Sequence, residues 1–206
     1  MKKLFLASSF ADVAEHFKDF IGQETESKTV TFIPTASIVE KMNFYVKADR
    51  KALEGMGLIL DDLEISQASQ DEIRAKLVLN DFIYVSGGNT FYLLQELKRT
   101  GADQLIQEQI GQGKPYMGAS AGSMVLAPHI DYVKAMDSPK KAPILSDYTA
   151  LSVVDFYPLP HYGEFPFKKA GEKILQEYQS GRKLYPINNH QVIIMNGDVV
   201  TVKGKV

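Results

Sequence analysis

The chain contains no cysteine among its 206 residues. It therefore has no disulfide framework, no thiolate nucleophile and no cysteine-coordinated zinc. This absence is compatible with a reducing cytoplasm. No apolar run approaches the roughly 18 residues that a membrane-spanning helix needs, and the short run Leu4–Ala7 is soon followed by the charged residues Asp12 and Glu15, unlike a secretory leader. We expect a cytoplasmic protein with no membrane partner.

Charge of one sign is also lacking. The 23 Lys and Arg residues nearly balance the 25 Asp and Glu residues, which gives a formal net charge of -2, and no basic run stands out. This balance argues against nucleic acid as the main partner. The hydrophobic fraction of 45% can build a sizeable core. With no repeat or linker in sight, we expect one domain over residues 1–206.

Apolar runs alternate with amphipathic stretches through the first two thirds of the chain. The runs predict strands at 4–7, 29–33, 58–65, 82–85 and 116–117, and the amphipathic stretches predict helices at 12–21, 39–53, 71–79, 90–99 and 121–126. Continuous apolar strands are typical of a parallel sheet that helices cover on both faces, so the pattern indicates a doubly wound α/β fold. Its strand-to-helix turns meet at one sheet edge, where ligands bind.

The last third of the chain follows a different pattern. The polar segment 131–147 predicts a loop or small hairpin, and the remaining elements are extended segments at 153–156 and 158–161, a helix at 167–179, and strands at 184–187, 192–195 and 199–202. Asn196-Gly197-Asp198 between the last two strands is a strong signal for a C-terminal hairpin.

The strongest local signal for chemistry is Gly118-Ala119-Ser120-Ala121-Gly122, between a predicted strand and a predicted helix. A serine with glycine two residues before and two after, on a strand–turn–helix, is the pattern of a nucleophile elbow. The sharp turn raises the hydroxyl above the sheet edge, and the helix N-terminus presents amide donors to a reacting carbonyl. The alternative is a Gly/Ser/Ala turn without chemistry.

A second signal is Ser86-Gly87-Gly88-Asn89-Thr90, directly after the strand at 82–85. Backbone amides in such a turn can face a ligand oxygen, either as an oxyanion hole shared with the amide that follows the serine or as a phosphate cradle. A nucleotide site is weakly supported, because neither a dinucleotide fingerprint nor a P-loop lysine is present. The plain alternative is a tight turn with Asn89 or Thr90 as the helix N-cap.

A serine nucleophile needs a base, and the chain has four histidines. His161 is favoured because it follows a proline-stiffened strand and precedes a glycine. His129 and His190 are the alternatives, and His16 fits a surface position. For the carboxylate that orients the imidazole, the pattern leaves several acids open between or near the serine and His161: Asp131, Asp137, Asp147, Asp155 and Glu164.

Together, the elbow, Gly87–Phe91 and Pro160-His161-Tyr162 resemble the dipeptidase E (α-aspartyl dipeptidase) and cyanophycinase-like serine peptidases. The early strand and turn Thr31–Ala36 also fit, and the resemblance spans nearly the whole chain in the same order. It implies a fold similar to class I glutamine amidotransferases, with serine where those enzymes place cysteine.

The resemblance also implies roles for individual residues. The catalytic serine falls on Ser120 and the histidine on His161. The acid falls on Asp137, with Glu164 and Asp155 in reserve. The oxyanion donors fall on two backbone amides: those of Gly88 and Ala121.

One departure concerns specificity. Dipeptidase E carries an arginine after its histidine, near the start of the next helix, that is thought to bind the substrate's aspartate side chain. In this chain the same region offers only lysines, at Lys168, Lys169 and Lys173. Lysine is a point charge and does not replace the fork of arginine, so aspartyl specificity is in doubt.

The resulting expectation is a serine exopeptidase or dipeptidase that acts on small peptides through a Ser-His-Asp triad and an acyl-enzyme, without a metal or cofactor. Two alternatives stay open. One is an esterase or amidase acting on a non-peptide acyl group, and the other is a catalytically silent sensor of a small ligand. The sequence leaves the oligomeric state open, with a homodimer as one expectation.

Overall fold

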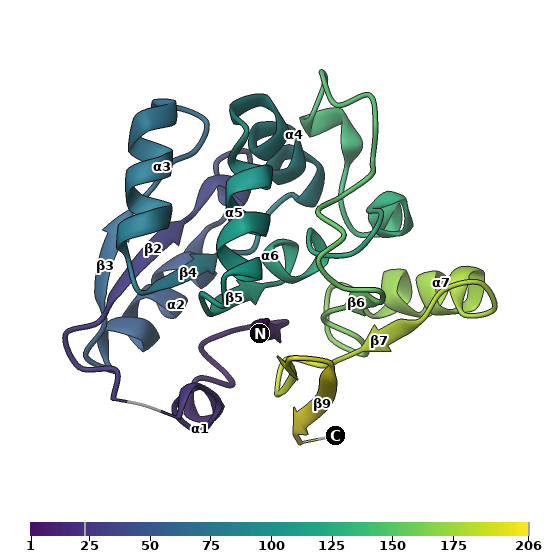
Figure 1. The fold of residues 1–206 in the computed structure, drawn as a ribbon. Coiled ribbons are helices and arrows are strands. Elements are labelled where there is room, and N and C mark those ends of the chain that lie inside the picture. Colours follow the sequence, from purple (N-terminus) through teal and green to yellow (C-terminus); the bar gives the residue numbers. More distant parts are fainter. Residues whose placement is uncertain (23, 206) are drawn as a thin grey trace.

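The computed structural model describes residues 1–22 and 24–205, which alternate between strands and helices (Figure 1). In chain order the elements are β1 (Lys3–Ala7), α1 (Glu15–Ile21), β2 (Thr29–Ile33), η1 (Thr35–Ser37), α2 (Phe44–Glu54), β3 (Ile59–Asp62), α3 (Gln70–Leu79), β4 (Phe82–Val85), α4 (Thr90–Thr100), α5 (Ala102–Gly111), β5 (Tyr116–Ala119), α6 (Ala121–Met124), η2 (Asp131–Ala135), η3 (Pro139–Lys141), β6 (Tyr157–Leu159), α7 (Lys168–Tyr178), β7 (Leu184–Pro186), β8 (Gln191–Asn196) and β9 (Val199–Gly204), where η denotes a 3-10 helix.

Within the described ranges, one seven-stranded sheet has the order β3-β2-β4-β5-β1-β8-β9. The first five strands in this order are parallel, while β8 and β9 run antiparallel to their neighbours. Ala7 pairs with Ala119, and Val85 pairs with Gly118. The carboxyl ends of β1, β4 and β5 therefore lie side by side. This register confirms the predicted α/β sheet and brings the two glycine-containing turns to one edge.

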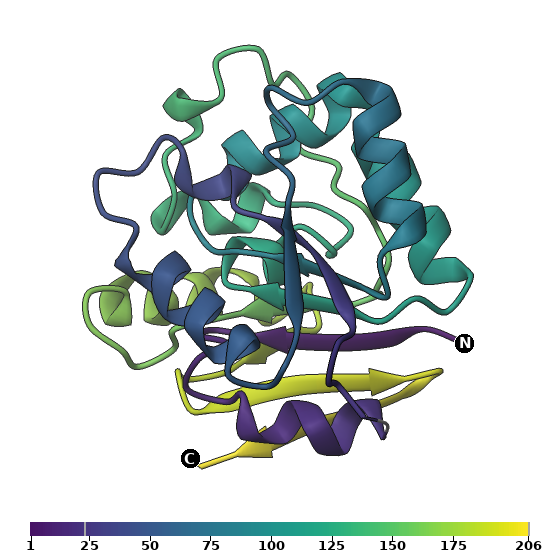
Figure 2. The ribbon, with the colours of Figure 1, turned by 90° about the vertical axis from the view of Figure 1, so that its left-hand side faces the viewer.

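The sheet separates two apolar cores. Leu4 and Leu6 of β1 face the core that includes residues of α3, α4 and α5, whereas Phe5 and Ala7 face the core that includes residues of α1 and α2. All four side chains are fully buried. Such alternation explains why β1 is apolar at every position, because both of its faces are covered. Figure 2 shows β1 (purple) beside the C-terminal strands (yellow), with α1 lying against them.

Helix α5 is a difference from the sequence-based prediction, which places no element between the helix at 90–99 and the strand at 116. The cause is Gly101, which adopts a left-handed conformation (φ 75°), ends α4 and immediately precedes α5. A glycine C-cap followed at once by a new helix is easily taken for the end of helical structure. The buried pair Ile106 and Ile110, spaced four residues apart, is the signal for the second helix.

The segment 131–147 also differs from the expected loop or hairpin. It holds the two 3-10 helices η2 and η3, and Pro139 starts the second. Proline favours the first turn of a helix because it has no amide hydrogen to satisfy there. Because the segment is polar and these helices are short, the sequence pattern does not predict them. Asp137 lies between the two.

The C-terminal hairpin is confirmed. β8 and β9 are paired antiparallel through the predicted turn, where Gly197 has a φ of 61°. The strands β6 and β7 stay outside the main sheet and pair in parallel with each other, with Leu159 opposite Pro186. Because parallel strands end at the same edge, the residues after β6 and after β7 lie close together.

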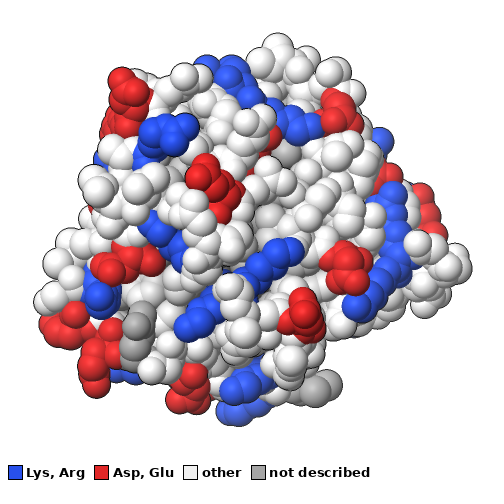
Figure 3. Space-filling view, in the orientation of Figure 1, with Lys and Arg blue, Asp and Glu red and all other residues white. Residues whose placement is uncertain are grey.

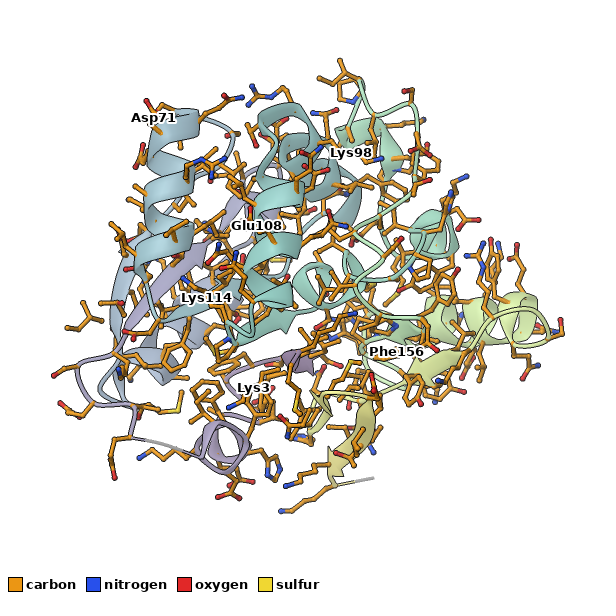
Figure 4. The ribbon with its side chains drawn as sticks, viewed as in Figure 1. Lys3, Asp71, Lys98, Glu108, Lys114 and Phe156 are labelled. Carbon is orange, nitrogen blue, oxygen red and sulfur yellow. The ribbon has the colours of Figure 1, made fainter. Side chains whose placement is uncertain are left out.

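The surface carries both charge signs, and basic and acidic side chains are interspersed on the face shown in Figure 3. Lys114, labelled in Figure 4, donates from Nζ to the carbonyl oxygens of Leu77, Val78 and Asn80, which ties the loop after α5 to the end of α3. In the described part of the chain, every helix is too short or too polar to cross a bilayer.

Candidate active site

Ser120 lies at the turn between β5 and α6 in a strained backbone conformation, with φ 49° and ψ −106°. The two flanking glycines make this turn possible. A Cβ on Gly118 would lie 2.5 Å from the carbonyl oxygen of Gly122, and one on Gly122 would lie 2.1 Å from the carbonyl oxygen of Val85. The backbones of β5, α6 and β4 therefore approach one another so closely that only glycine fits at these two positions. The geometry is that of a nucleophile elbow.

The imidazole of His161 reaches this serine from a distant part of the chain. Its Nε2 lies 3.0 Å from the Oγ of Ser120. His161 follows β6 and has a φ of 58°, and its backbone amide donates to the Oγ of Ser8 at 3.0 Å. The ring also stacks on Phe167, with centroids 5.0 Å apart. Strand end, backbone anchor and ring stacking together hold the imidazole toward the serine.

The second ring nitrogen of His161 is held by a residue that the sequence analysis did not select. Nδ1 lies 2.7 Å from the side-chain oxygen of Asn189. An amide oxygen only accepts hydrogen bonds, so Nδ1 carries the proton and Nε2 is free to accept one from Ser120. Asn189 follows β7 as His161 follows β6, and the two strands are paired in parallel. The signal available in the sequence was the polar pair Asn188-Asn189 at the end of a strand.

The structure places the predicted acid Asp137 away from the imidazole. Its Oδ2 accepts hydrogen bonds from the backbone amide and the Oγ1 of Thr90, at 2.8 and 2.5 Å. Asp155 pairs with Lys183 at 3.7 Å, and the carboxylate of Glu164 acts on His161 through its charge. Among the described residues, Asn189 is the one side chain that bonds Nδ1 of His161. The orienting group is therefore an amide in place of the expected carboxylate.

The other three histidines lie away from Ser120 and have other neighbours. His129 pairs with Asp131, which also receives two hydrogen bonds from Arg182. The backbone amide of His190 donates to Asn188, and His16 lies beside an acidic neighbour on α1. None of these groups is within hydrogen-bond distance of Ser120 in the described residues.

The oxyanion donors are predicted to be the amides of Gly88, which lines the same cavity as Ser120, and of Ala121, which is the next residue after Ser120. A Cβ on Gly87 would lie 3.2 Å from the Cβ of Ser120, which shows how closely the two turns meet. Gly88 has a φ of 138° and passes so near Ala36 that a Cβ would overlap its carbonyl group at 2.2 Å. Asn89 caps α4 by accepting from Tyr92, as one sequence alternative predicted.

Burial lowers the pKa of His161 below its ordinary value of 6.5, although the Asn189 hydrogen bond and the charge of Glu164 act in the opposite direction. Desolvation disfavours the charged imidazolium, so the ring is neutral at neutral pH. A neutral imidazole that accepts from a serine hydroxyl is in the protonation state that a general base requires.

Ser120 and His161 open into a cavity of about 710 Å³, a size common for small-molecule sites. Exposed Phe44 and Phe165 stand among its lining residues, and Asp137 and Asn189 face the same space. Within the described residues, no cluster of three or more His, Asp or Glu side chains could hold a metal ion.

An α/β sheet that presents a strained serine and a neutral imidazole in a cavity is an arrangement typical of serine hydrolases. The chain belongs to peptidase family S51, whose model matches residues 4–203. It is 55% identical to an uncharacterized peptidase of Pasteurella multocida over 99% of this chain and 98% of that one. These findings confirm the expected peptidase class.

Two further relatives place the fold. A crystal structure of a Listeria monocytogenes protein provisionally called a peptidase E superposes with a TM-score of 0.96 at 54% identity, covering all of both chains. A peptidase E of Nostoc is 30% identical over 78% of this chain and 66% of that one. The resemblance to dipeptidase E-like peptidases, drawn from motifs alone, is thereby confirmed.

Proposed function

We propose that this peptidase is a serine exopeptidase that cleaves small peptides through an acyl-enzyme, with Ser120 as nucleophile and His161 as general base. Asn189 replaces the expected carboxylate as the group that orients the imidazole. The observation that carries the proposal is the 3.0 Å distance between Ser120 Oγ and His161 Nε2 inside an open cavity.

In the first half of the reaction, Ser120 Oγ attacks the scissile carbonyl carbon while Nε2 of His161 takes the hydroxyl proton. The amides of Gly88 and Ala121 stabilise the negative oxygen that develops. His161 then donates the proton to the leaving amine, and the C–N bond breaks. An ester between Ser120 and the N-terminal part of the substrate remains.

In the second half, a water molecule gives a proton to His161 and attacks the ester carbonyl. The serine leaves and recovers its proton from the imidazole. The imidazolium is positively charged in both halves, and the amide of Asn189 can accept its Nδ1 hydrogen but supplies no full negative charge. The dipole of Asn189 and the polar groups of the cavity therefore stabilise the imidazolium, which a carboxylate does in other triads.

A separation of Ser120 and His161 beyond hydrogen-bond distance would favour the silent-sensor alternative, whereas the observed 3.0 Å favours a hydrolase. The exopeptidase specificity rests on the family resemblance and on the cavity size, which suits a short peptide.

The test is turnover of a panel of dipeptides and tripeptides by the wild type, Ser120→Ala and the matched surface variant Ser146→Ala. We expect Ser120→Ala to lower kcat by several orders of magnitude with the fold intact, and Ser146→Ala to match the wild type. Near-unchanged hydrolysis by Ser120→Ala, or a panel of esters cleaved in preference to every peptide, contradicts the proposal.

A further inference from the structure

The carboxylate of Asp137 is firmly placed but has an oxygen to spare. Both hydrogen bonds from Thr90 go to Oδ2, which fixes the group against the first residue of α4. In the described part of the chain, Oδ1 forms no hydrogen bond or ion pair, although Asp137 lines the cavity that contains Ser120. Because Oδ2 is held by Thr90, Oδ1 can accept a hydrogen bond from a donor in the cavity.

The distance from this carboxylate to the serine suits a short peptide. A Cβ on Gly87 would lie 3.2 Å from the Cβ of Ser120, Thr90 follows three residues later, and three residues of chain span at most about 10 Å. An extended peptide advances about 3.4 Å per residue. With its scissile carbonyl at Ser120, a substrate can therefore present to Asp137 a group that lies one or two residues from the cleaved bond.

The charges around Asp137 favour a cation at this point. Four carboxylates line the cavity against two lysines in the described residues, and one of these lysines, Lys141, is paired with Glu40 at 2.7 Å. Burial, helped by the charge of Glu40 and opposed by the Thr90 hydrogen bonds and the charge of Lys141, raises the pKa of Asp137 to about 6, so the group is ionised at pH 7 and above. Burial and the charges of Glu40, Asp137 and Asp49 raise the pKa of Tyr45 to about 12. Tyr45 lines the same cavity as these three acids.

Resting on the proposed peptidase function, we propose that Asp137 is a specificity residue that binds an ammonium group of the substrate. The ammonium is the N-terminal α-amine or the side chain of an N-terminal lysine. Free or basic N-termini are then preferred, and an N-terminal aspartate side chain is repelled by the cavity wall. A charged N–H···carboxylate bond in a partly buried site is roughly twice as strong as a neutral one, which makes it an effective selector.

Matched peptides separate the two sources of the ammonium. Lys-Ala-Ala carries both, norleucine-Ala-Ala keeps only the α-amine, and N-acetyl-Lys-Ala-Ala keeps only the side chain. If acetylation alone removes the preference, Asp137 binds the α-amine; if norleucine alone removes it, Asp137 binds the side chain. Equal kcat/KM for all three peptides and for the doubly neutral N-acetyl-norleucine-Ala-Ala overturns the proposal.

The variant Asp137→Asn keeps an oxygen for Thr90 and removes the charge. We expect at least a tenfold rise of KM for Lys-Ala-Ala, with much less change of kcat, and unaltered kcat/KM for the doubly neutral peptide. Asp71→Asn, an exposed acid on α3 labelled in Figure 4, is the matched control and should behave as the wild type. An equal loss on charged and neutral peptides in Asp137→Asn shows a merely structural role and overturns the proposal.

A binding measurement keeps this result separate from failure of the proposed function. If the wild type cleaves no peptide, the peptidase mechanism fails, and calorimetry on Ser120→Ala decides about Asp137. Binding of Lys-Ala-Ala that weakens at least tenfold when Asp137→Asn is added supports the ammonium site. Unchanged binding in the double variant, or no binding to Ser120→Ala, overturns it.

Discussion

The side-chain oxygen of Asn189 lies 2.7 Å from Nδ1 of His161, while Nε2 of the same ring lies 3.0 Å from Ser120. The imidazole is therefore held between a neutral acceptor and a hydroxyl. A carboxylate in the place of Asn189 would stabilise the imidazolium by charge, whereas an amide fixes mainly the tautomer and the direction of the ring. Burial lowers the pKa of His161, and the hydrogen bond to Asn189 opposes that shift without reversing it.

The first prediction concerns Asn189. Asn189→Ala removes the acceptor that positions the ring, and kcat/KM should fall on the order of 100-fold, because small misplacements of a catalytic group carry that cost. Asn189→Asp places a charge beside Nδ1, should retain activity, and should move the acid limb of the kcat/KM profile to higher pH. A pH profile of both variants checks this, and an unmoved limb in Asn189→Asp would show that the side chain does not act on His161.

The second prediction is a pH dependence set by His161. The base must be neutral, and its pKa is lowered, so the midpoint of the acid limb of kcat/KM should lie below the ordinary imidazole value of 6.5. Glu164 raises this pKa through its charge. Glu164→Gln should therefore shift the acid limb to still lower pH, with the plateau unchanged. A shift to higher pH would contradict this arrangement of charges.

The third prediction concerns the close approach at the elbow. Gly122→Ala places a Cβ 2.1 Å from the carbonyl oxygen of Val85 and should destabilise the fold by about 1–3 kcal/mol, the usual cost of overpacking, or more. Gly111→Ala is the control, because a Cβ there meets nothing within 4 Å and alanine favours the helix. Urea unfolding should show Gly111→Ala at or above wild-type stability. Equal stabilities of the two variants would refute the steric account.

The fourth prediction links stability to Asp49. Burial raises its pKa to about 6, against the pull of hydrogen bonds from Tyr84 and the Ala11 amide. The folded state then holds a proton that the unfolded state releases between about pH 4 and 6. The free energy of unfolding should fall by up to about 3 kcal/mol as pH rises through that range.

Asp49→Asn removes this titration, and the fall in unfolding free energy should become shallower. Asp137, with a similarly raised pKa, leaves a residual slope in that variant. Urea unfolding at several pH values measures both slopes, and identical slopes in wild type and Asp49→Asn would contradict the prediction.

The fold was largely predictable because burial on both faces makes each central strand a continuous apolar run, and such runs are easy to detect. The elbow was equally visible, since only glycine fits at Gly118 and Gly122. The second helix of the α4–α5 pair was missed because Gly101 ends one helix just where the next begins.

The partner of His161 could not be predicted in the same way. Its identity depends on the parallel pairing of two three-residue strands, β6 and β7, and short strands leave little periodicity in a sequence. Family resemblance directed attention to a carboxylate, Asp137. In the structure, the two 3-10 helices on either side of Asp137 place its carboxylate against Thr90 and in the cavity wall. Only three-dimensional contacts show this placement.

The most direct measurement of the central claim is reaction with a fluorophosphonate probe, followed by peptide mapping by mass spectrometry. The account predicts a single adduct on Ser120 in the wild type, none in Ser120→Ala, and a rate at least 100-fold slower in His161→Ala. A folded wild-type protein with Ser120 unlabelled, or an equal labelling rate after loss of the imidazole, would contradict it.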